Sequence, residues 1–249
     1  MAMWRGVILA VQFLTVLPIR MQVEWNERTG RIAVLSFPLV GAMIGALLVA
    51  QHALLFGHVS LLVLSFSLLF SSIFLSGGLH ADGWMDCSDA YFSYRDLQRR
   101  LDIMSDSRVG AFAVLSILFL LGFRFVFMFE TIAHLSLFSL FCLPFLSRLG
   151  MTLLLLTAPL AKQTGMAAAF RKYVDHRYVP IIVMYGLIAF LSRETLVLFL
   201  ALMLFYVAAR AFAVKQFGGI TGDVLGAFIE GSETFLWLII WLLHTFVIL

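Results

Sequence analysis

Apolar runs of about 20 residues recur along the whole chain, and they constrain the fold more than any other feature of the sequence. A helix of roughly 20 residues crosses the hydrocarbon core of a bilayer, which is about 30 Å thick. Charged residues make up only 12% of the 249 residues, about half the share found in soluble domains. A membrane β-barrel would show alternating segments of about ten residues instead. The sequence therefore predicts an all-α, polytopic transmembrane helical bundle.

Eight apolar segments are expected, and the first is short for a membrane span. They cover residues 7–19, 32–56, 59–79, 109–129, 135–160, 179–192, 195–214 and 235–249. We expect about seven spans, with six to eight as the range, because segment 7–19 has only about 13 residues. Segments 179–192 and 195–214 would form a tight hairpin around Arg193 and Glu194. No repeat or linker divides the sequence, which favours a single domain over residues 1–249.

Positive charge is concentrated in four longer polar loops, at 20–31, 80–108, 161–178 and 215–234. These loops carry 12 of the 17 lysines and arginines, whereas the short opposite connections carry only Arg193. Lysine and arginine bias a loop toward the cytoplasm. With alternating spans, all four loops fall on one face. We therefore expect a protein integral to the cytoplasmic membrane, with its catalytic loops and active site facing the cytoplasm.

Loop 80–108 holds six of the 14 acidic residues, and three of them have helical spacing. Asp82, Asp86 and Asp89 would share one face of a helix. Like charges at this spacing repel one another, and a cation between the carboxylates relieves the repulsion. Mg²⁺ suits oxygen ligands of this kind together with substrate phosphate. We predict that the three aspartates are catalytic residues and metal ligands, with a solvated acidic loop as the alternative; Gly77 and Gly78 would allow the chain to turn before them.

Two further polar stretches are candidates for phosphate binding. Asp106 and Arg108 precede segment 109–129, where the planar guanidinium of Arg108 can clamp a phosphate or simply anchor the helix at the interface. The glycine-rich stretch 217–230 predicts backbone in close approach to a ligand, with amides and a hydroxyl facing phosphate. Its candidate substrate-binding residues are Gly219, Thr221, Gly222 and Asp223, and Asp223 has a helix cap or a second metal as alternatives.

Arg124 and Arg148 are the notable charges inside apolar segments, where an arginine marks a functional site or a buried pair. Arg148 follows Pro144 near the middle of its segment, so we expect it to face the bundle interior and to meet an acidic loop residue or a substrate phosphate. Arg124 is nearer the outer end of its segment, and snorkelling of its side chain explains it. His80 would point away from Asp82 on a helix but join the site on a turn.

Six motifs in order resemble the cobalamin synthase family, the adenosylcobinamide-GDP ribazoletransferases, over nearly the whole chain. They are FLTVLP at 13–18, FPLVG at 37–41, GGLHADG at 77–83 with Asp86 and Asp89, IMSDSRVG at 103–110, GMAAAF at 165–170 and GGITGDVLGA at 218–227. Lys162 stands where the family has arginine, and Met166 where leucine is common. These two departures affect the details of one loop.

The resemblance implies a membrane-embedded, Mg²⁺-dependent enzyme. Such an enzyme joins α-ribazole, or α-ribazole 5′-phosphate, to adenosylcobinamide-GDP, and it releases GMP with adenosylcobalamin or its 5′-phosphate. The residues carried over are Asp82, Asp86, Asp89, Asp106, Arg108 and Asp223. Arg108 is predicted to be catalytic, as a residue that stabilises charge on the leaving GMP. Arg148, Lys162 and His80 complete the predicted substrate-binding set. The expected partners are these small molecules and the lipid bilayer, and no nucleic acid; a homo-oligomer and association with other cobalamin-assembly enzymes are left open.

Two other functions are alternatives. A CDP-alcohol-phosphotransferase-like membrane transferase also uses spaced aspartates over Mg²⁺, but it expects an alanine–arginine pair soon after Asp-Gly. Here Trp84 and Met85 follow Asp82 and Gly83, so this pattern fails. A transporter would place polar residues near the membrane midplane on broken helices. Arg148 and Pro144 are compatible with that, whereas the acidic residues lie in loops on one face.

Overall fold

The computed structural model describes residues 2–246 and is helical throughout. Its α-helices are α1 (Ala2–Leu14), α2 (Glu27–Leu55), α3 (Leu61–Leu75), α4 (Leu79–Phe92), α5 (Leu97–Met104), α6 (Ala111–Thr131), α7 (Leu137–Thr157), α8 (Gly165–Arg171), α9 (Val179–Tyr185), α10 (Arg193–Phe217) and α11 (Gly222–Phe246). Two 3₁₀ helices, η1 (His176–Tyr178) and η2 (Gly186–Leu191), flank α9. Within this range no β-strand is present, and the predicted all-α class is confirmed.

Five helices are long and apolar enough to cross a membrane: α2, α6, α7, α10 and α11. Two bent pairs, α3 with α4 and α8 with residues 176–191, raise the number of spans to seven at most. The chain is a multi-pass helical membrane protein, as predicted. Helix α1 covers residues 2–14 rather than 7–19 and is too short to be counted among the spans. The end of the last predicted segment, residues 247–249, lies outside the described residues.

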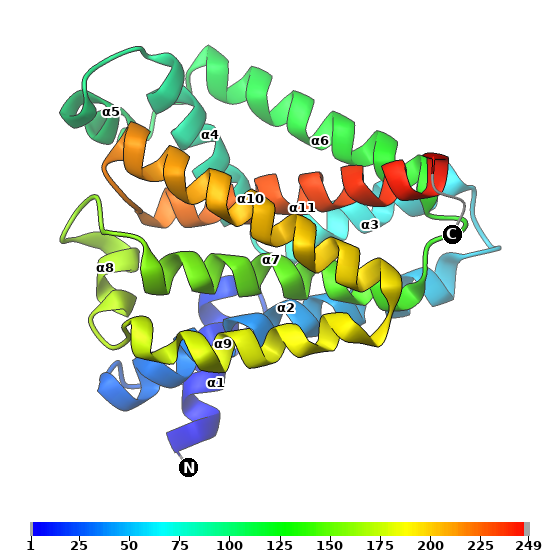
Figure 1. Cartoon of the computed structure of the whole chain (residues 1–249), viewed down its shortest axis with the longest axis horizontal. Helices are drawn as coiled ribbons and strands as arrows, with labels where there is room; N and C mark the ends of the chain where they lie inside the picture. Colours follow the sequence, from blue (N-terminus) through cyan, green and yellow to red (C-terminus); the bar gives the residue numbers. More distant parts are fainter. Residues whose placement is uncertain (1, 247–249) are drawn as a thin grey trace.

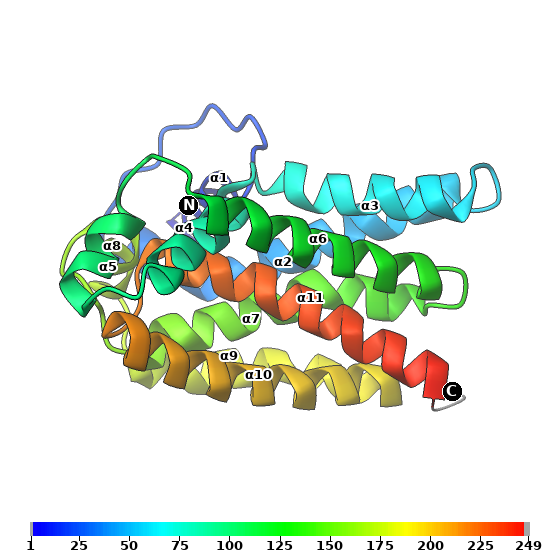
Figure 2. The same ribbon diagram turned by 90° about the horizontal axis from the view of Figure 1, so that it is seen from above.

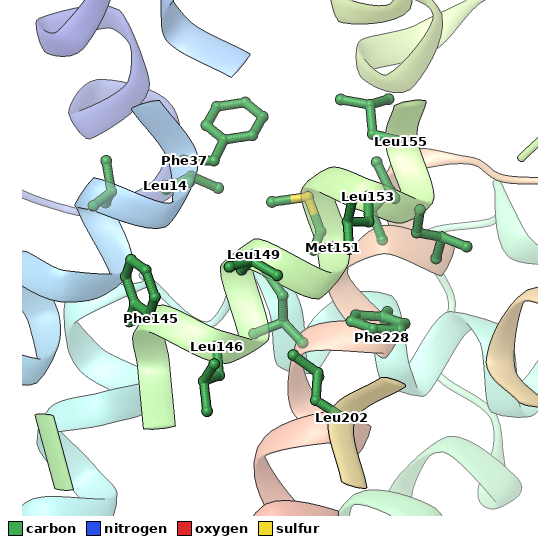
Figure 3. Packing of buried hydrophobic residues seen from close by; sticks show 14 of the residues in the cluster. Leu14, Phe37, Phe145, Leu146, Leu149, Met151, Leu153, Leu155, Leu202 and Phe228 are labelled. Atoms are coloured by element: carbon green, nitrogen blue, oxygen red, sulfur yellow. The ribbon is translucent and has the colours of Figure 1, made fainter. Parts of the chain in front are cut away.

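Helix α7 occupies the centre of the bundle. Of its most apolar 18 residues 89% are buried, compared with 22% for α6 at the periphery. Figure 3 shows Leu146 and Leu149 of α7 among side chains from several other helices, including Phe37 of α2, Leu202 of α10 and Phe228 of α11. The outer faces of α3, α6 and α10 expose phenylalanine, leucine and valine side chains, as expected for surfaces in contact with hydrocarbon.

Helices α2 and α7 pack closely because two glycines of α2 face the backbone of α7. A Cβ atom on Gly41 would lie 2.3 Å from the carbonyl oxygen of Pro144, and one on Gly45 would lie 2.2 Å from that of Phe141. Glycines four residues apart allow helix backbones to approach one another in membranes, where van der Waals packing drives association. The stretch 41–45 therefore determines how closely α2 approaches the central helix.

The predicted polar regions 20–31, 80–108 and 161–178, and the start of 215–234, lie at one end of the bundle, which we call the polar end (Figures 1 and 2). It comprises the connections 15–26, 76–78, 93–110, 158–178 and 218–221 together with α4, α5 and α8. The prediction that these regions share a face is confirmed except for residues 224–234, which run inward along α11. Two of them are not loops over their whole length. Most of 80–108 is helical and forms α4 and α5. Of 215–234, only residues 218–221 form a connection, and the remaining residues belong to α10 and α11.

Candidate active site

Helix α4 lies across the polar end because two glycines redirect the chain after α3. Gly77 and Gly78 have φ angles of 66° and 71°, in the left-handed region that glycine adopts without strain. The chain bends by 85° between α3 and α4, as the sequence predicted for this pair. Asp82, Asp86 and Asp89 all lie on α4, which confirms the helical spacing assumed for them. Asp82 is exposed, and the other two are half-buried.

A fourth carboxylate reaches this group from the first turn of α11. Helices α4 and α11 meet at glycines: a Cβ on Gly83 would lie 2.6 Å from the carbonyl oxygen of Asp223, and one on Gly226 would lie 3.1 Å from Cα of His80. Asp223 therefore lies beside the carboxylates of α4. Partial burial, which is the largest cause, and the negative charges of Asp82, Asp223 and Asp89 together raise the pKa of Asp86 to about 7. We call Asp82, Asp86 and Asp223 the acidic cluster.

Asp89 is turned toward the start of α6. Its carboxylate accepts hydrogen bonds from the backbone N–H of Gly110, at 2.6 Å, and of Ala113, at 2.8 Å. The first N–H groups of a helix lack partners within the helix, and an anion there is also favoured by the helix dipole. A side chain at position 110 would collide with this carboxylate, since its Cβ would lie 2.5 Å from Oδ1. Asp89 thus ties α4 to α6.

The three aspartates expected as metal ligands do not form a complete protein cage. Within residues 2–246, no three His, Cys, Asp or Glu side chains are arranged to hold a metal ion. Both carboxylate oxygens of Asp89 accept hydrogen bonds from backbone at the start of α6. Asp82 and Asp86 remain as oxygen donors. Two carboxylates suit Mg²⁺, which in proteins usually binds one or two carboxylates and completes its coordination shell with water and substrate phosphate.

The glycine-rich stretch contacts protein backbone at the position where a ligand was expected. Gly219 has φ 149°, and a Cβ there would lie 2.3 Å from the carbonyl oxygen of Pro159. This approach lets Ile220 pair with the segment around Leu160, with the amide of Ile220 bonded to Pro159 O at 2.9 Å. The prediction that Gly219 brings backbone to a ligand is therefore not supported by this geometry, because the partner is residues 159–161.

Thr221, rather than Asp223, caps α11. The Thr221 hydroxyl accepts a hydrogen bond from the amide of Val224 at 3.2 Å and donates one to Asp223 Oδ2 at 3.2 Å. A hydroxyl in this position satisfies an N–H at the helix start. The bond that the hydroxyl donates orients one oxygen of Asp223. Gly222, which lies between the two residues in sequence, is exposed. Thr221 therefore acts by positioning the Asp223 carboxylate.

Arg108 and Asp106 form an exposed ion pair at the polar end. The guanidinium Nε of Arg108 lies 3.0 Å from Asp106 Oδ1, and the Arg108 side chain is 87% exposed. Hydrogen bonds from Arg108 lower the pKa of Asp106 to about 2. Lys162 is held on α5, with its ammonium 2.8 Å from the carbonyl oxygen of Leu101. The positive charge of Lys162 also acts on Asp223, where it favours the charged carboxylate.

Four charged side chains are buried together inside the bundle. Arg124 donates to Glu230 at 2.7 Å and to Glu233 at 3.3 Å, and Arg148 donates to Glu233. The prediction for Arg148 is confirmed in that it faces the interior, but its partner is a helix residue, and at 2% exposure it does not reach the polar surface. The snorkelling explanation for Arg124 is wrong, since the side chain is 1% exposed and Thr234 also accepts from it.

Glu230 and Glu233 belong to the stretch 215–234, which was predicted to be a polar loop and is largely part of α11. Their position in an otherwise apolar stretch that continues to residue 246 could have indicated that they lie on a membrane helix. Two carboxylates one turn apart on a membrane helix require cationic partners, and Arg124 and Arg148 supply them here. The network pairs two positive with two negative charges, so it adds no net charge to the interior.

The chain matches the cobalamin-5-phosphate synthase family over residues 6–241. It is 54% identical to an adenosylcobinamide-GDP ribazoletransferase of Geobacillus sp. (strain WCH70), over 99% of this chain and 98% of that protein. The protein of the same name from Geobacillus thermodenitrificans (strain NG80-2) is 49% identical, over 98% of this chain and 97% of its own. One from Pseudomonas aeruginosa is 37% identical over 92% and 94%. No solved structure matches the chain. With its whole helical framework covered by these matches, the chain belongs to the cobalamin-5-phosphate synthase family.

Proposed function

We propose that this protein is an adenosylcobinamide-GDP ribazoletransferase. It would join α-ribazole, or α-ribazole 5′-phosphate, to adenosylcobinamide-GDP and release GMP. The observation that carries this proposal is the acidic cluster at the polar end, in a chain of this family. Carboxylates whose charges raise one another's proton affinity form a site for a cation, and a pyrophosphate substrate supplies the remaining oxygen ligands.

The reaction is a displacement at phosphorus. When the acceptor carries a 5′-phosphate, the product still carries it, so the attacking group is a ring hydroxyl of the ribose. Its oxygen forms a bond to the cobinamide-linked phosphorus while the bond from that phosphorus to the oxygen of GMP breaks, and GMP leaves with the electron pair. The hydroxyl proton goes to a carboxylate. Asp223 would be this base, because it lies beside the acidic residues of α4.

The residues of the site would act mainly by positioning and by charge. Asp82 and Asp86 would hold Mg²⁺, which neutralises negative charge on the pyrophosphate when it is bound. Thr221 orients Asp223, and Lys162 adds positive charge near it. Arg108 is exposed at the same end and is available to a phosphate once it exchanges Asp106 for the substrate. Asp89 keeps α4 in place through its bonds to α6.

The test is release of GMP by the detergent-purified protein with both substrates and Mg²⁺. Asp82→Asn and Asp86→Asn should each lower kcat by about a hundredfold or more, as expected for groups that stabilise transition-state charge. Asp102→Asn is the matched control, because Asp102 is an exposed carboxylate on neighbouring α5. Equal GMP release by all three variants would remove the acidic cluster from the mechanism. No GMP release by the wild-type protein, together with substrate counterflow in vesicles, would favour a transporter.

We also propose that the polar end faces the cytoplasm. Support comes from the charge count, since 12 of the 17 lysines and arginines lie in the four predicted polar loops. Single cysteines at exposed positions of opposite ends, Gln163→Cys and His58→Cys, test it with a membrane-impermeant maleimide on intact cells. Labelling of position 58 alone is expected. Labelling of position 163 alone would reverse the orientation.

A further inference from the structure

A cavity of about 150 Å³ adjoins the acidic cluster on its apolar side. Its walls come from α1, α2, α4, α7, α8 and α11, and most are apolar; four of the lining residues, from α1, α2 and α7, are labelled in Figure 3: Leu14, Phe37, Met151 and Leu155. Two polar side chains, His80 and Asp223, also line it. Because Asp223 belongs to the acidic cluster as well, a ligand in this cavity would reach the reacting phosphate.

The hydrogen-bonding state of His80 follows from its neighbour. His80 is 3% exposed, and its Nδ1 lies 3.5 Å from Nη2 of Arg148. A guanidinium only donates hydrogen bonds, so the Nδ1 facing it presents a lone pair and the ring proton is on Nε2. Glu233 holds Arg148 in place, which fixes this tautomer.

The Nε2 donor of His80 lacks an acceptor among the described residues. It is buried and makes no hydrogen bond, and buried donors in native proteins almost always have a partner. The side chain lines the cavity, so an acceptor placed there would satisfy it. An acyl chain from the bilayer would fill the apolar volume but has no acceptor for this proton.

The remaining walls favour a flat aromatic ligand. Phe170 lies 4.7 Å from Phe13 and 5.2 Å from Phe37, measured between ring centroids, and all three line the cavity. Aromatic rings stack or meet edge to face with other rings at such distances. The volume suits one bicyclic ring and is far too small for a corrin macrocycle.

We propose that this cavity binds the benzimidazole base of α-ribazole, with His80 Nε2–H donating to the unsubstituted ring nitrogen. The proposal rests on the proposed function and names the subsite for the acceptor. The ribose would then lie beside Gly222 and Asp223, with its ring hydroxyls toward the acidic cluster. The corrinoid-GDP substrate would approach from the exposed side of Asp82 and would not enter the cavity.

The first experiment compares substrates in the GMP-release assay. His80→Phe should raise KM for α-ribazole about tenfold or more and leave KM for adenosylcobinamide-GDP unchanged, because a site built around a hydrogen bond discriminates strongly once the bond is lost. His80→Gln places an amide donor near Nε2 and should recover part of the loss. Ala167→Leu fills the same cavity and should have the same selective effect. Ala209→Leu is the control, since Ala209 lines a separate cavity between α4, α10 and α11.

The second experiment is independent of turnover. Binding of free 5,6-dimethylbenzimidazole and of 5,6-dimethylindole to the purified protein is measured by ligand-observed NMR. The indole lacks the acceptor nitrogen, so the wild-type protein should prefer the benzimidazole about tenfold or more, and His80→Phe should abolish that preference. This assay still decides the proposal if the protein releases no GMP, so failure of the proposed function is recognised separately.

Three results would overturn the proposal. The first is an increase in KM for adenosylcobinamide-GDP, rather than for α-ribazole, in both His80→Phe and Ala167→Leu. The second is equal affinity of the wild-type protein for the benzimidazole and the indole. The third is a tightly bound phospholipid, detected by mass spectrometry, that Ala167→Leu expels and the base does not displace.

Discussion

Replacing Glu233 by glutamine tests whether the buried ionic network holds the bundle together. The substitution keeps the size of the side chain and removes its charge. Within residues 2–246, Glu233 is the only residue that forms ion pairs with both buried arginines, and it also accepts a hydrogen bond from Ser147 at 3.1 Å. Without its charge, two arginines at 1% and 2% exposure would share the single carboxylate of Glu230.

The expected loss is large because a charge left unpaired in a buried site keeps its full desolvation cost. Breaking a buried ion pair by removing one partner costs about 3–5 kcal/mol. For a chain of this size, each kcal/mol shifts the thermal midpoint by about 2–4 °C, so we expect the midpoint to fall by about 6–20 °C. Arg148→Met combined with Glu233→Gln should lose less than the sum of the two single variants, because the two residues are in contact.

The assay uses the two cysteines as reporters. Cys87 and Cys142 are both buried and free, so a thiol-reactive fluorescent maleimide labels them only as the protein unfolds in detergent. Asp175→Asn is the control, since it makes the same chemical change in an exposed pair with Arg177 and should leave the midpoint unchanged. If Glu233→Gln melts at the same temperature as Asp175→Asn, the network does not contribute to stability and the argument from burial is wrong.

Three further predictions concern packing, capping and pH. Gly45→Leu should prevent folding, judged by a loss of the monodisperse peak in size-exclusion chromatography, because its Cβ would lie 2.2 Å from backbone of α7; Gly122→Leu has open space around it and should elute normally. Asp89→Ala should lower the free energy of unfolding by about 1–2 kcal/mol through loss of the bonds at the start of α6, whereas Asp89→Asn should retain far more GMP release than Asp86→Asn. The pKa of Asp86 is about 7 in the folded, metal-free protein, compared with an ordinary value of 3.8, so the folded state binds more protons than the unfolded state between these values. The thermal midpoint without metal should therefore fall as pH rises from about 4 to about 7. Mn²⁺ affinity measured by EPR should rise between about pH 6 and 8, because the metal binds the deprotonated carboxylate. Asp86→Asn should remove both effects.

Most of the membrane architecture could be predicted because it depends on local properties. The apolar runs predicted the spanning helices, and the i, i+4, i+7 spacing placed Asp82, Asp86 and Asp89 on one helical segment. Gly77 and Gly78 marked the bend before it. Helix formation involves hydrogen bonds four residues apart, and insertion responds to the hydropathy of each segment, so neither requires knowledge of distant partners.

Which partner each polar group finds was decided by the tertiary structure. The same spacing that grouped the three aspartates did not show that Asp89 would bind the start of α6, about twenty residues away in sequence. The glycine at 219 was recognised as a place of close approach, but only the packed chain shows that residues 159–161 approach it.

The sequence by itself determined that this chain is a helical membrane protein with an aspartate-rich helix at one end, because periodicity and hydropathy act along the chain. The tertiary structure decided that Asp223 joins that helix, that Arg124 and Arg148 pair with Glu230 and Glu233, and that His80 lines a cavity. These contacts join helices whose residues are tens to more than a hundred positions apart. Their geometry follows from how the side chains of α4, α6, α7 and α11 pack together, which no local pattern encodes.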